Sequence, residues 1–317
     1  MEQSIKVSVL VPFYNVENFV GRCVESLFTQ TYDNIEYVFV NNCSTDKSRD
    51  IITDNMAKYG VAAKCKLIDH EENLGIAVSR NDCLDNATGD YILFVDSDDY
   101  VERNMVELLV QAAVENDADI AGCSYISEFA KQSIPMHEFY PNDHDKMMRH
   151  ITMLRIKACM WKMLIRRSVI EDNHVRFLPK PDMVDDYLFC CQVVYYARTY
   201  TTVQAYLYHY VHYNPNNYSK RAAYNVETQA SAIMEVEKFY REKGVYDVVK
   251  QELEQRKFFA KAPLVLDKKC INVKRWRELM PECNDGWHNL PFTFGNKLTF
   301  WLADSPLWRL VQLKAWS

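Results

Sequence analysis

The chain has 317 residues, of which 48% are hydrophobic and 25% are charged, and its formal net charge is −6 at pH 7. These proportions are typical of soluble globular proteins and exclude a disordered or fibrous chain. The acidic balance also argues against nucleic acid as a partner, because phosphate binding requires clustered Lys and Arg.

Cysteine usage and the first residues indicate the compartment. The ten cysteines are scattered, with no C-x-x-C and no zinc-like spacing, which favours a reducing environment. Residues 1–6 are polar and lead directly into a predicted strand, and no run of about 18 uncharged apolar residues could span a bilayer. We therefore expect a cytoplasmic protein without a signal peptide.

In the first 126 residues, short apolar runs alternate with helix-like segments. The strands are apolar throughout, as expected when helices cover both faces of a parallel sheet. The sequence therefore predicts an α/β fold with a mainly parallel central sheet. The predicted strands are 6–13, 35–40, 64–70, 90–95 and 118–126, and the predicted helices end at Gln30 or span 48–59, 76–87 and about 102–115.

Polar residues follow the predicted strands, at 12–15, 41–46, 73–75 and 96–99. Ligands of such sheets bind at the carboxyl ends of the strands, so these segments form the expected site. Neither G-x-G-x-x-G nor the Walker phosphate loop occurs, and only 8 glycines are present. A Rossmann dehydrogenase and a P-loop kinase are therefore disfavoured.

Beyond about residue 130 the alternation is less regular, and from Val226 the chain becomes helical and charged. We predict one domain over residues 1–220, divided into halves at 1–125 and 126–220. A helical extension over 221–317, ending in an aromatic tail, is predicted to follow it.

Asp96 and Asp98 form a D-x-D sequence on the turn after the strand 90–95. Two carboxylates so spaced can hold a divalent cation, Mn²⁺ or Mg²⁺, and leave open positions for a substrate diphosphate. Alternatively, residues 97–99 cap the helix expected near Glu102, because acidic and hydroxyl residues favour helix N-termini.

Further strings flank this turn in order: "VSVLVPFYN", "SLFTQTY", "EYVFVNNCSTD", "ENLGIAVSRNDCLDNATGDYILFVDSDD", "WKMLIRRSVI", and "VRF" before "VDDYLF". Segment by segment, they resemble the family 2 glycosyltransferases of bacterial polysaccharide assembly, over residues 5 to about 220. The resemblance implies the Rossmann-like A-type fold, with a nucleotide-binding half at 1–125 and an acceptor half at 126–220. It also implies sugar transfer from a nucleoside diphosphate-sugar, UDP-sugar favoured, to a hydroxyl of a saccharide or lipid-linked acceptor.

The resemblance implies roles for residues of the first half. Tyr14 looks like the aromatic residue that stacks on the nucleotide base, and Pro12 is similar to the neighbouring base contact. Arg80 looks like the cation near the diphosphate, Asp96 like the ribose or metal-side carboxylate, and Asp98 like the direct metal ligand. The alternatives are core packing for Tyr14 and a solvated helix face for Arg80.

Asn41 and Asn42 depart from the family pattern, which usually has two aspartates before S-T-D. The second of these accepts the uracil N3 hydrogen in the family. Asn42 can still accept that hydrogen bond through its carboxamide oxygen, but it lacks the charge and adds donors. The base preference therefore stays open.

Asp185 and Asp186 resemble the family's Glu-Asp pair, with Asp186 at the catalytic aspartate and Asp185 on the acceptor side. A carboxylate in hydrogen-bond reach of an acceptor hydroxyl can take its proton as that oxygen attacks the anomeric carbon. Such a single displacement inverts the anomeric configuration. The alternative is that the pair caps the helix beginning at "YLFCCQVVYYA".

Four further residues could take part. Trp161 and Lys162 could border the acceptor site, although Trp161 is equally suited to the core. His209 and His212 could contact a diphosphate or a metal, or simply pack among the neighbouring tyrosines.

The tail over residues 298–316 has Ser305 as a candidate N-cap, Pro306 at a first helical position, and three tryptophans among leucines. It is suited either to an amphipathic helix lying on the inner face of the plasma membrane or to a helix docked on its own domain. The tryptophans are Trp301, Trp308 and Trp316.

Two other functions remain open. A haloacid-dehalogenase-like phosphatase is one, since "ILFVDSDDYV" looks like its strand and D-x-D, although Asp99 and Tyr100 stand where Gly and Thr are usual. The other is a catalytically inactive subunit that binds a nucleotide-sugar, motivated by Asn41 and Asn42.

Overall fold

The computed structural model describes residues 5–179, 185–215, 226–290 and 292–313, without the side chains of Asp185, Asn289 and residues 312–313. Its strands are β1 Val7–Phe13, β2 Ile35–Asn41, β3 Cys65–Asp69, β4 Tyr91–Phe94, β5 Tyr100–Val101, β6 Ile120–Glu128, β7 Ser133–Met136, β8 Met163–Arg166 and β9 Tyr200–Val211. Its helices are α1 Val20–Phe28, α2 Ser48–Tyr59, α3 Ile76–Asp85, α4 Met105–Glu115, α5 His144–Thr152, α6 Arg167–Glu171, α7 Asp185–Tyr196, α9 Val226–Glu242, α10 Tyr246–Lys261, α11 Pro263–Leu266, α12 Val273–Glu278, α13 Phe294–Asp304 and α14 Arg309–Leu313. Short 3₁₀ turns occur at Ala62–Lys64, Met160–Lys162 and Pro281–Asn289.

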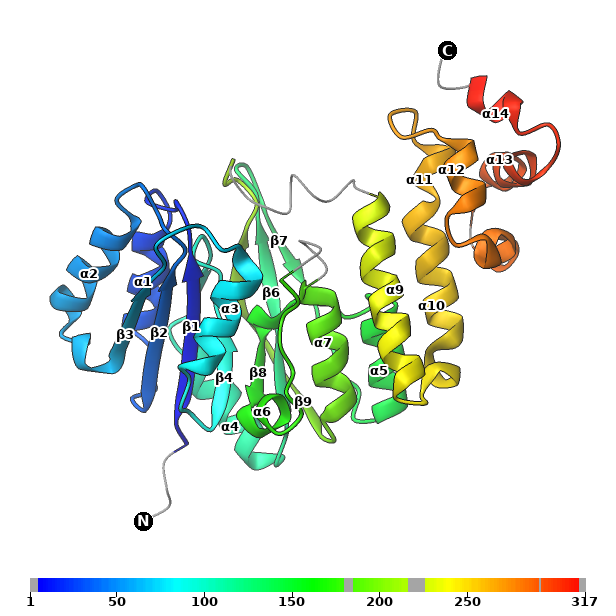
Figure 1. The fold of residues 1–317 in the computed structure, drawn as a ribbon. Coiled ribbons are helices and arrows are strands. Elements are labelled where there is room, and N and C mark those ends of the chain that lie inside the picture. Colours follow the sequence, from blue (N-terminus) through cyan, green and yellow to red (C-terminus); the bar gives the residue numbers. More distant parts are fainter. Residues whose placement is uncertain (1–4, 180–184, 216–225, 291, 314–317) are drawn as a thin grey trace.

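Within the described residues, the strands form one nine-stranded sheet in the order β3-β2-β1-β4-β8-β6-β9-β5, with β7 beside β6 (Figure 1). Strands β3, β2, β1 and β4 are parallel, and β6 and β9 run in the same direction as these four. Only β8, β7 and β5 run the opposite way. The predicted α/β fold with a mainly parallel sheet is therefore confirmed.

The central strands are apolar because both of their faces are covered. All seven residues of β1 are buried, and alternate side chains enter opposite cores: Val9 and Val11 join one cluster, Leu10 the other. Helices α1, α2 and α4 supply the first cluster, whereas α3, α5, α6 and α7 supply the second.

One predicted element begins later than expected. The helix expected near Glu102 begins at Met105, and the short strand β5 occupies residues 100–101 before it. The turn at 96–99 therefore leads into a strand and not into a helix.

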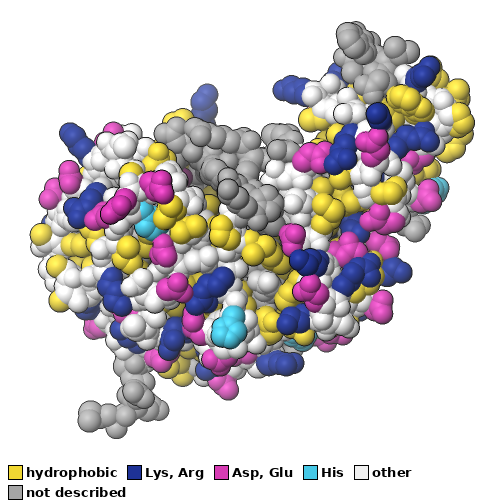
Figure 2. All heavy atoms as spheres, viewed as in Figure 1, with side chains coloured by type: hydrophobic (Ala, Val, Ile, Leu, Met, Phe, Trp, Pro, Cys, Tyr) yellow, Lys and Arg dark blue, Asp and Glu magenta, His cyan; other side chains and the backbone are white. Residues whose placement is uncertain are grey.

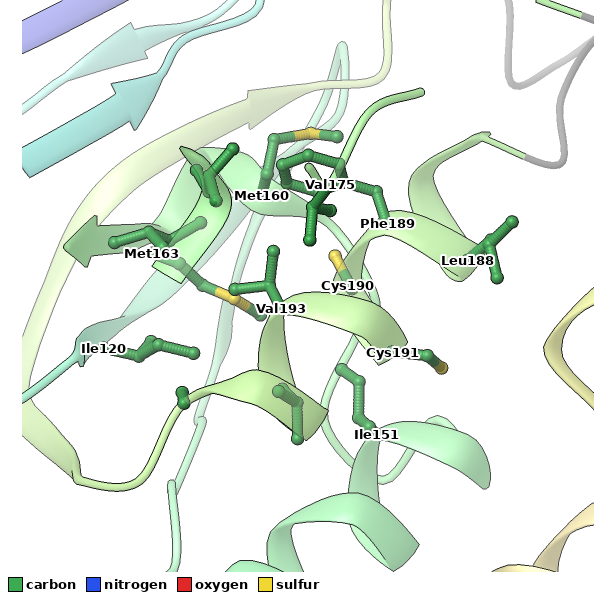
Figure 3. Close-up of a cluster of buried hydrophobic side chains, with 14 of the residues drawn as sticks. Ile120, Ile151, Met160, Met163, Val175, Leu188, Phe189, Cys190, Cys191 and Val193 are labelled. Atoms are coloured by element: carbon green, nitrogen blue, oxygen red, sulfur yellow. The ribbon is translucent and has the colours of Figure 1, made fainter. Parts of the chain in front are cut away.

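The second half of the sheet is built around α7 and β9. The Tyr-rich stretch from Tyr195 to Tyr218, for which the sequence predicts no element, contains β9, which pairs with β6 in parallel and with β5 at its end. Figure 3 shows Cys190 and Val193 of α7 facing Met160 and Met163, and all four belong to one buried cluster. This packing holds the middle of α7 against the sheet.

The C-terminal helices divide between two cores. Helices α9 and α10 pack on α5 and α7 and share their cluster, through residues such as Tyr240 and Leu253. Residues from α11 to α14, together with the start of α9 and Phe258 of α10, form another cluster that contains Trp276 and Phe300. We call residues 263–313 the C-terminal module. The predicted boundary near residue 220 lies outside the described residues.

The tail is not one continuous helix. Helix α13 ends at Asp304, Ser305 is its C-cap, and α14 starts only at Arg309. The prediction of a helix with Ser305 as N-cap and Pro306 in its first turn is therefore wrong, although the Ser305 hydroxyl accepts the Leu307 N–H at 3.1 Å. Trp316 lies outside the described residues. No helix in the described ranges combines the length and the apolar character that crossing a membrane would require.

Candidate functional site

The predicted site residues of the first half gather at the carboxyl ends of β1, β2 and β4. Parallel strands end at the same edge of the sheet, so the segments after them share one surface. Pro12 is the buried penultimate residue of β1, and Tyr14 follows the strand with 44% of its surface exposed. Core packing is therefore not the role of Tyr14, and its ring is accessible to a flat ligand.

The loops after β1 and β2 hold each other by side-chain hydrogen bonds. Asn15, in the left-handed region at φ 49°, accepts the Thr45 N–H at 2.8 Å. The Asn15 N–H donates to the Ser44 hydroxyl at 3.1 Å, and the Val16 N–H donates to the Ser48 hydroxyl at 2.8 Å. These bonds explain the local role of the S-T-D segment: they fix the backbone that presents Tyr14.

Asn41 is part of a neutralised cluster at the end of β2. Its Nδ2 donates to Asp69 Oδ1 at 2.9 Å, and its Oδ1 accepts the Ser44 N–H at 2.9 Å. Asp69 also accepts from Arg49 Nε at 3.0 Å, and the guanidinium lowers the pKa of Asp69. An aspartate at position 41 would place a second carboxylate against Asp69, so asparagine suits this chain.

Asn42 is buried, and both ends of its carboxamide have protein partners. Its Oδ1 accepts the Leu74 N–H at 2.8 Å and lies 3.2 Å from His70 Nδ1. Its Nδ2 donates to Asn73 Oδ1 at 2.9 Å. The contact expected with a base would therefore require one of these bonds to be exchanged.

The D-x-D turn does not cap a helix. Its chain reversal is closed by the Asp99 N–H donating to the Asp96 carbonyl at 3.0 Å, and α4 has Asn104 as its N-cap. The capping alternative for residues 97–99 is thus wrong for α4. The carboxylates of the turn are available for other roles.

Asp99 points inward and is fully buried. It accepts the Tyr208 hydroxyl at 2.7 Å and the Val211 N–H at 2.7 Å, while that hydroxyl also accepts the Asp96 N–H at 3.1 Å. Burial, followed by the negative charge of Asp98, raises the pKa of Asp99 well above its ordinary range. Asp99 and Tyr208 therefore anchor the turn to β9.

Asp98 lies beside a residue that the sequence did not single out. Its Oδ2 accepts from Asn214 Nδ2 at 2.8 Å. Burial, followed by the negative charge of Asp96, raises the pKa of Asp98 to about 6. A carboxylate pair under such repulsion is suited to a cation.

Arg80 joins the two predicted acidic groups. Its side chain, only 8% exposed, projects from α3. Its Nη2 lies 3.5 Å from Asp96 Oδ1, and its Nη1 donates to Asp186 Oδ1. The alternative of a solvated helix face is therefore wrong. Asp186 is in the first turn of α7, which Asp185 begins, and the Asp185 side chain lies outside the described residues.

The other acceptor-side candidates are buried. Trp161 is 2% exposed and stacks on Tyr208 at 4.2 Å between ring centroids. Lys162 is fully buried, 2.9 Å from Glu138 Oε1. Direct contact with an acceptor is not available to either side chain as it lies, so Trp161 can act only through its neighbours.

The two candidate histidines have structural partners. His209 stacks on Tyr100 at 4.1 Å and its nitrogens lie 2.8 Å from Glu128 and 2.9 Å from Glu102. His212 stacks on Phe129 at 4.3 Å. These contacts hold β9 against β5 and β6, which accounts for both rings without a ligand.

Tyr208 and Asn214 are the site neighbours that sequence reasoning missed. Both lie in the Tyr-rich stretch, where aromatic residues are so frequent that none stands out. The available signal was the neighbouring Asp99, a third carboxylate after a strand that needs a buried donor when it does not cap a helix.

The carboxylates of the D-x-D turn are the candidate ligands of a divalent cation. In the described ranges, no group of three or more His, Cys, Asp or Glu side chains is arranged to hold a metal ion. Asp96 and Asp98 offer oxygen ligands, and burial, followed by the negative charge of Asp96, raises the pKa of Asp98. Two carboxylates fit Mg²⁺ or Mn²⁺, which usually complete their shells with water and substrate phosphates.

The model of the family described as "Glycosyl transferase family 2" matches residues 8–173, which include the D-x-D turn, Arg80 and the Asn41–Asn42 pair. EpsH of Bacillus subtilis (strain 168), named provisionally as a glycosyltransferase, is 33% identical over 213 residues, 64% of this chain and 60% of EpsH. The poly(ribitol-phosphate) beta-glucosyltransferase of Bacillus spizizenii is 27% identical over 65% of this chain and 32% of its own length. The chain thus spans less than two thirds of either relative.

A solved structure has the same fold. S. aureus TarS 1–349 in complex with UDP-GlcNAc superposes with a TM-score of 0.68 at 20% sequence identity, over 98% of this chain and 88% of that one. The match includes the helical C-terminal region as well as the sheet. It supports the A-type glycosyltransferase fold.

Proposed function

The chain belongs to glycosyl transferase family 2, and we propose that it transfers a sugar from a nucleoside diphosphate-sugar to an acceptor hydroxyl, inverting the anomeric carbon. One observation carries the proposal: Arg80 contacts both Asp96 of the D-x-D turn and Asp186 at the start of α7. A donor-side carboxylate and a candidate base thereby meet at one cation. Family membership leaves the phosphatase hypothesis without support.

The donor would bind over the ends of β1 and β4. Tyr14 offers an exposed ring for base stacking, with Pro12 beneath the same edge. Arg80 would attract the diphosphate, whose charge competes with the two carboxylates for the guanidinium. A UDP-sugar is favoured, because the TarS structure with this fold holds UDP-GlcNAc.

Asp98 and Asp96 would hold Mn²⁺ or Mg²⁺. When bound, the cation would neutralise charge on the diphosphate leaving group. The residues themselves contribute placement: Asp99 and Tyr208 fix the turn, and Asn214 orients the Asp98 carboxylate.

Asp186 would act as the general base. Its carboxylate would take the proton of the acceptor hydroxyl as that oxygen forms a bond to the anomeric carbon. The bond from that carbon to the diphosphate oxygen breaks in the same step, and its electron pair leaves with the nucleoside diphosphate. Arg80 holds the base until the donor diphosphate draws the guanidinium away.

The acceptor would be a saccharide or a lipid-linked saccharide in cell-surface polysaccharide assembly. The supporting observation is the name of one relative, a poly(ribitol-phosphate) beta-glucosyltransferase. Tyr210, partly exposed beside Trp161 at 5.4 Å, extends the aromatic surface on this side.

The test is release of nucleoside diphosphate from a panel of UDP- and GDP-sugars with saccharide acceptors and Mn²⁺. We expect Asp186→Asn to lower turnover about 10²–10⁴-fold while keeping donor-induced thermal stabilisation. Asp98→Ala should lose turnover together with the Mn²⁺-dependent part of that stabilisation. Asp54→Asn, an exposed carboxylate on α2, is the matched control and should keep full activity.

Wild-type rates in both site variants would overturn the assignment. Donor binding without turnover in the wild-type protein, against a broad acceptor panel, would instead indicate a nucleotide-sugar-binding subunit.

A further inference from the structure

Helix α13 carries apolar side chains on two opposite faces. Thr299, Phe300 and Ala303 face the module core, where Phe300 stacks on Trp276 at 5.5 Å. Phe294, Leu298 and Trp301 are exposed by 83%, 44% and 52%. A helix that only covers a core has a polar outer face, so the outer face of α13 needs another explanation.

The exposed residues form a stripe along the helix. Positions 294, 298 and 301 are spaced i, i+4 and i+7, which places them one above the other on the same face. The chain after α13 continues this character, because Leu307 and Leu310 are 52% and 55% exposed. We call these five residues the outer stripe. Figure 2 shows apolar side chains gathered along the outer rim of this module.

The charges beside the outer stripe are basic. Lys297 lies within α13 and is partly exposed, with its Nζ donating to the His288 carbonyl at 3.2 Å, and Arg309 begins α14 beside Leu310 and is exposed. The acidic residue of the segment, Asp304, faces inward, where its Oδ1 accepts from Trp276 Nε1 and Asn284 Nδ2, each at 3.0 Å. The solvent side of residues 294–311 thus combines aromatic and leucine side chains with cationic charge, a combination suited to the anionic interface of a bilayer.

The position of the module agrees with that use. In Figure 1, β1 runs from the N-terminus at the bottom of the view to its carboxyl end at the top, and α13 and α14 also lie at the top. Helices α13 and α14 and the carboxyl end of β1 therefore lie toward the same end of the molecule (Figure 1).

We propose that the outer stripe (Phe294, Leu298, Trp301, Leu307 and Leu310), with Lys297 and Arg309, docks this protein on a lipid bilayer that carries anionic headgroups. The apolar side chains enter the headgroup–acyl boundary, and the two basic side chains contact the headgroup phosphates. The docking goes beyond the proposed reaction and requires no donor or acceptor.

The test is co-sedimentation of the full chain with vesicles of phosphatidylcholine and phosphatidylglycerol in equal parts. Leu298→Ser/Trp301→Ser should weaken binding at least about tenfold, because two exposed apolar side chains no longer leave water. The matched control is Val114→Ser/Met234→Ser, which removes two apolar side chains exposed by 55% and 46% on α4 and α9, and should bind like wild type. Lys297→Gln should weaken binding about fivefold, and the loss should disappear on pure phosphatidylcholine.

Equal vesicle binding by Leu298→Ser/Trp301→Ser and wild type would overturn the proposal. So would a wild-type protein that ignores vesicles while forming dimers that this double variant abolishes in light scattering, because the stripe would then be an interface between copies. Nucleoside diphosphate release with a soluble acceptor should be the same for the double variant and wild type. Failure of docking and failure of the proposed reaction are therefore read from separate assays.

Discussion

The ends of β2 and β4 lie on either side of the same central strand, β1, yet the polar residues at one end are neutral and those at the other are acidic. At the end of β2, Asn41 and Asn42 are neutral, and each makes hydrogen bonds through both ends of its carboxamide. At the end of β4, carboxylates crowd one turn, and burial with mutual repulsion raises the pKa values of Asp98 and Asp99. The β4 end thus retains unfavourable electrostatic energy that a bound cation can relieve, whereas the β2 end holds a loop in place.

Among the variants that test this comparison, the largest loss of stability should come from removing the hydrogen bonds that anchor the β4 turn. Tyr208→Phe keeps the ring stacked on Trp161 but removes the hydroxyl that binds Asp99 and the Asp96 N–H. We expect the free energy of unfolding to fall by about 1–3 kcal/mol, since a buried carboxyl loses its donor. Turnover and Mn²⁺ affinity, the latter measured by electron paramagnetic resonance, should both fall about tenfold or more.

The control for this prediction lies on the same strand. Tyr206 is 41% exposed, and Tyr206→Phe should leave stability, turnover and Mn²⁺ affinity unchanged. An unchanged Mn²⁺ affinity in Tyr208→Phe would mean that the hydroxyl only supports the fold.

Removing the charge of Asp98 should stabilise the protein and abolish its binding of Mn²⁺. The pKa of Asp98 is about 6 in the folded chain, against about 3.9 for an unperturbed aspartate. Between these values the folded state binds more protons than the unfolded state, so stability falls as pH rises through this window and the loss is complete above about pH 6. At 1.36 kcal/mol per pKa unit, the raised pKa of Asp98 lowers the free energy of unfolding by at most about 3 kcal/mol.

Asp98→Asn should therefore raise the free energy of unfolding at pH 7.5 by about 1–3 kcal/mol in the absence of metal, and this gain should vanish near pH 4. Denaturant unfolding in EDTA across that pH range measures it. Mn²⁺ should stabilise the wild type and leave Asp98→Asn unaffected. If Asp98→Asn were less stable than wild type at pH 7.5, the Asp98 carboxylate would not destabilise the fold and the prediction would be wrong.

The sequence was sufficient for the fold because its strands are apolar on both faces, as expected of a covered, mainly parallel sheet, and alternate with helix-like segments. It also placed Asp96 and Asp98 after a strand end, where the structure has them, whereas Arg80 lies in the middle of α3 and not at a helix end. It could not show that Asp99 turns inward or that Tyr208 meets it, because that contact joins β4 to a strand 109 residues later in the chain. The partners of Asn42 were also hidden, since Leu74 and Asn73 approach it only after folding.

A smaller effect is expected when charge is added to the β2 end. Asn41→Asp would put a carboxylate where Nδ2 now donates to Asp69 at 2.9 Å, and neither oxygen can supply the lost donor. We expect a loss of about 1–2 kcal/mol in the free energy of unfolding at pH 7.5. The double variant Asn41→Asp/Asp69→Asn restores a donor and should recover most of this loss, and a double-mutant cycle measures the coupling. Additive effects would show that Arg49 alone governs Asp69.

The smallest effect should follow at the next residue, because Asn42 has a neighbour that can adapt. In Asn42→Asp the carboxylate can still accept the Leu74 N–H and a His70 N–H, so only the bond to Asn73 Oδ1 is lost. Asn73 can rotate its carboxamide and donate instead, at the expense of the Gly75 N–H that Oδ1 now accepts at 3.0 Å. One bond is exchanged for another, and the stability change should stay within about 1 kcal/mol.

Because the oxygen of residue 42 stays occupied by the same two donors, the ratio of kcat/KM for UDP- and GDP-sugars should change less than about threefold in Asn42→Asp. A large shift in that ratio would mean that the base displaces one of these donors and contacts residue 42 directly, as the family pattern implies.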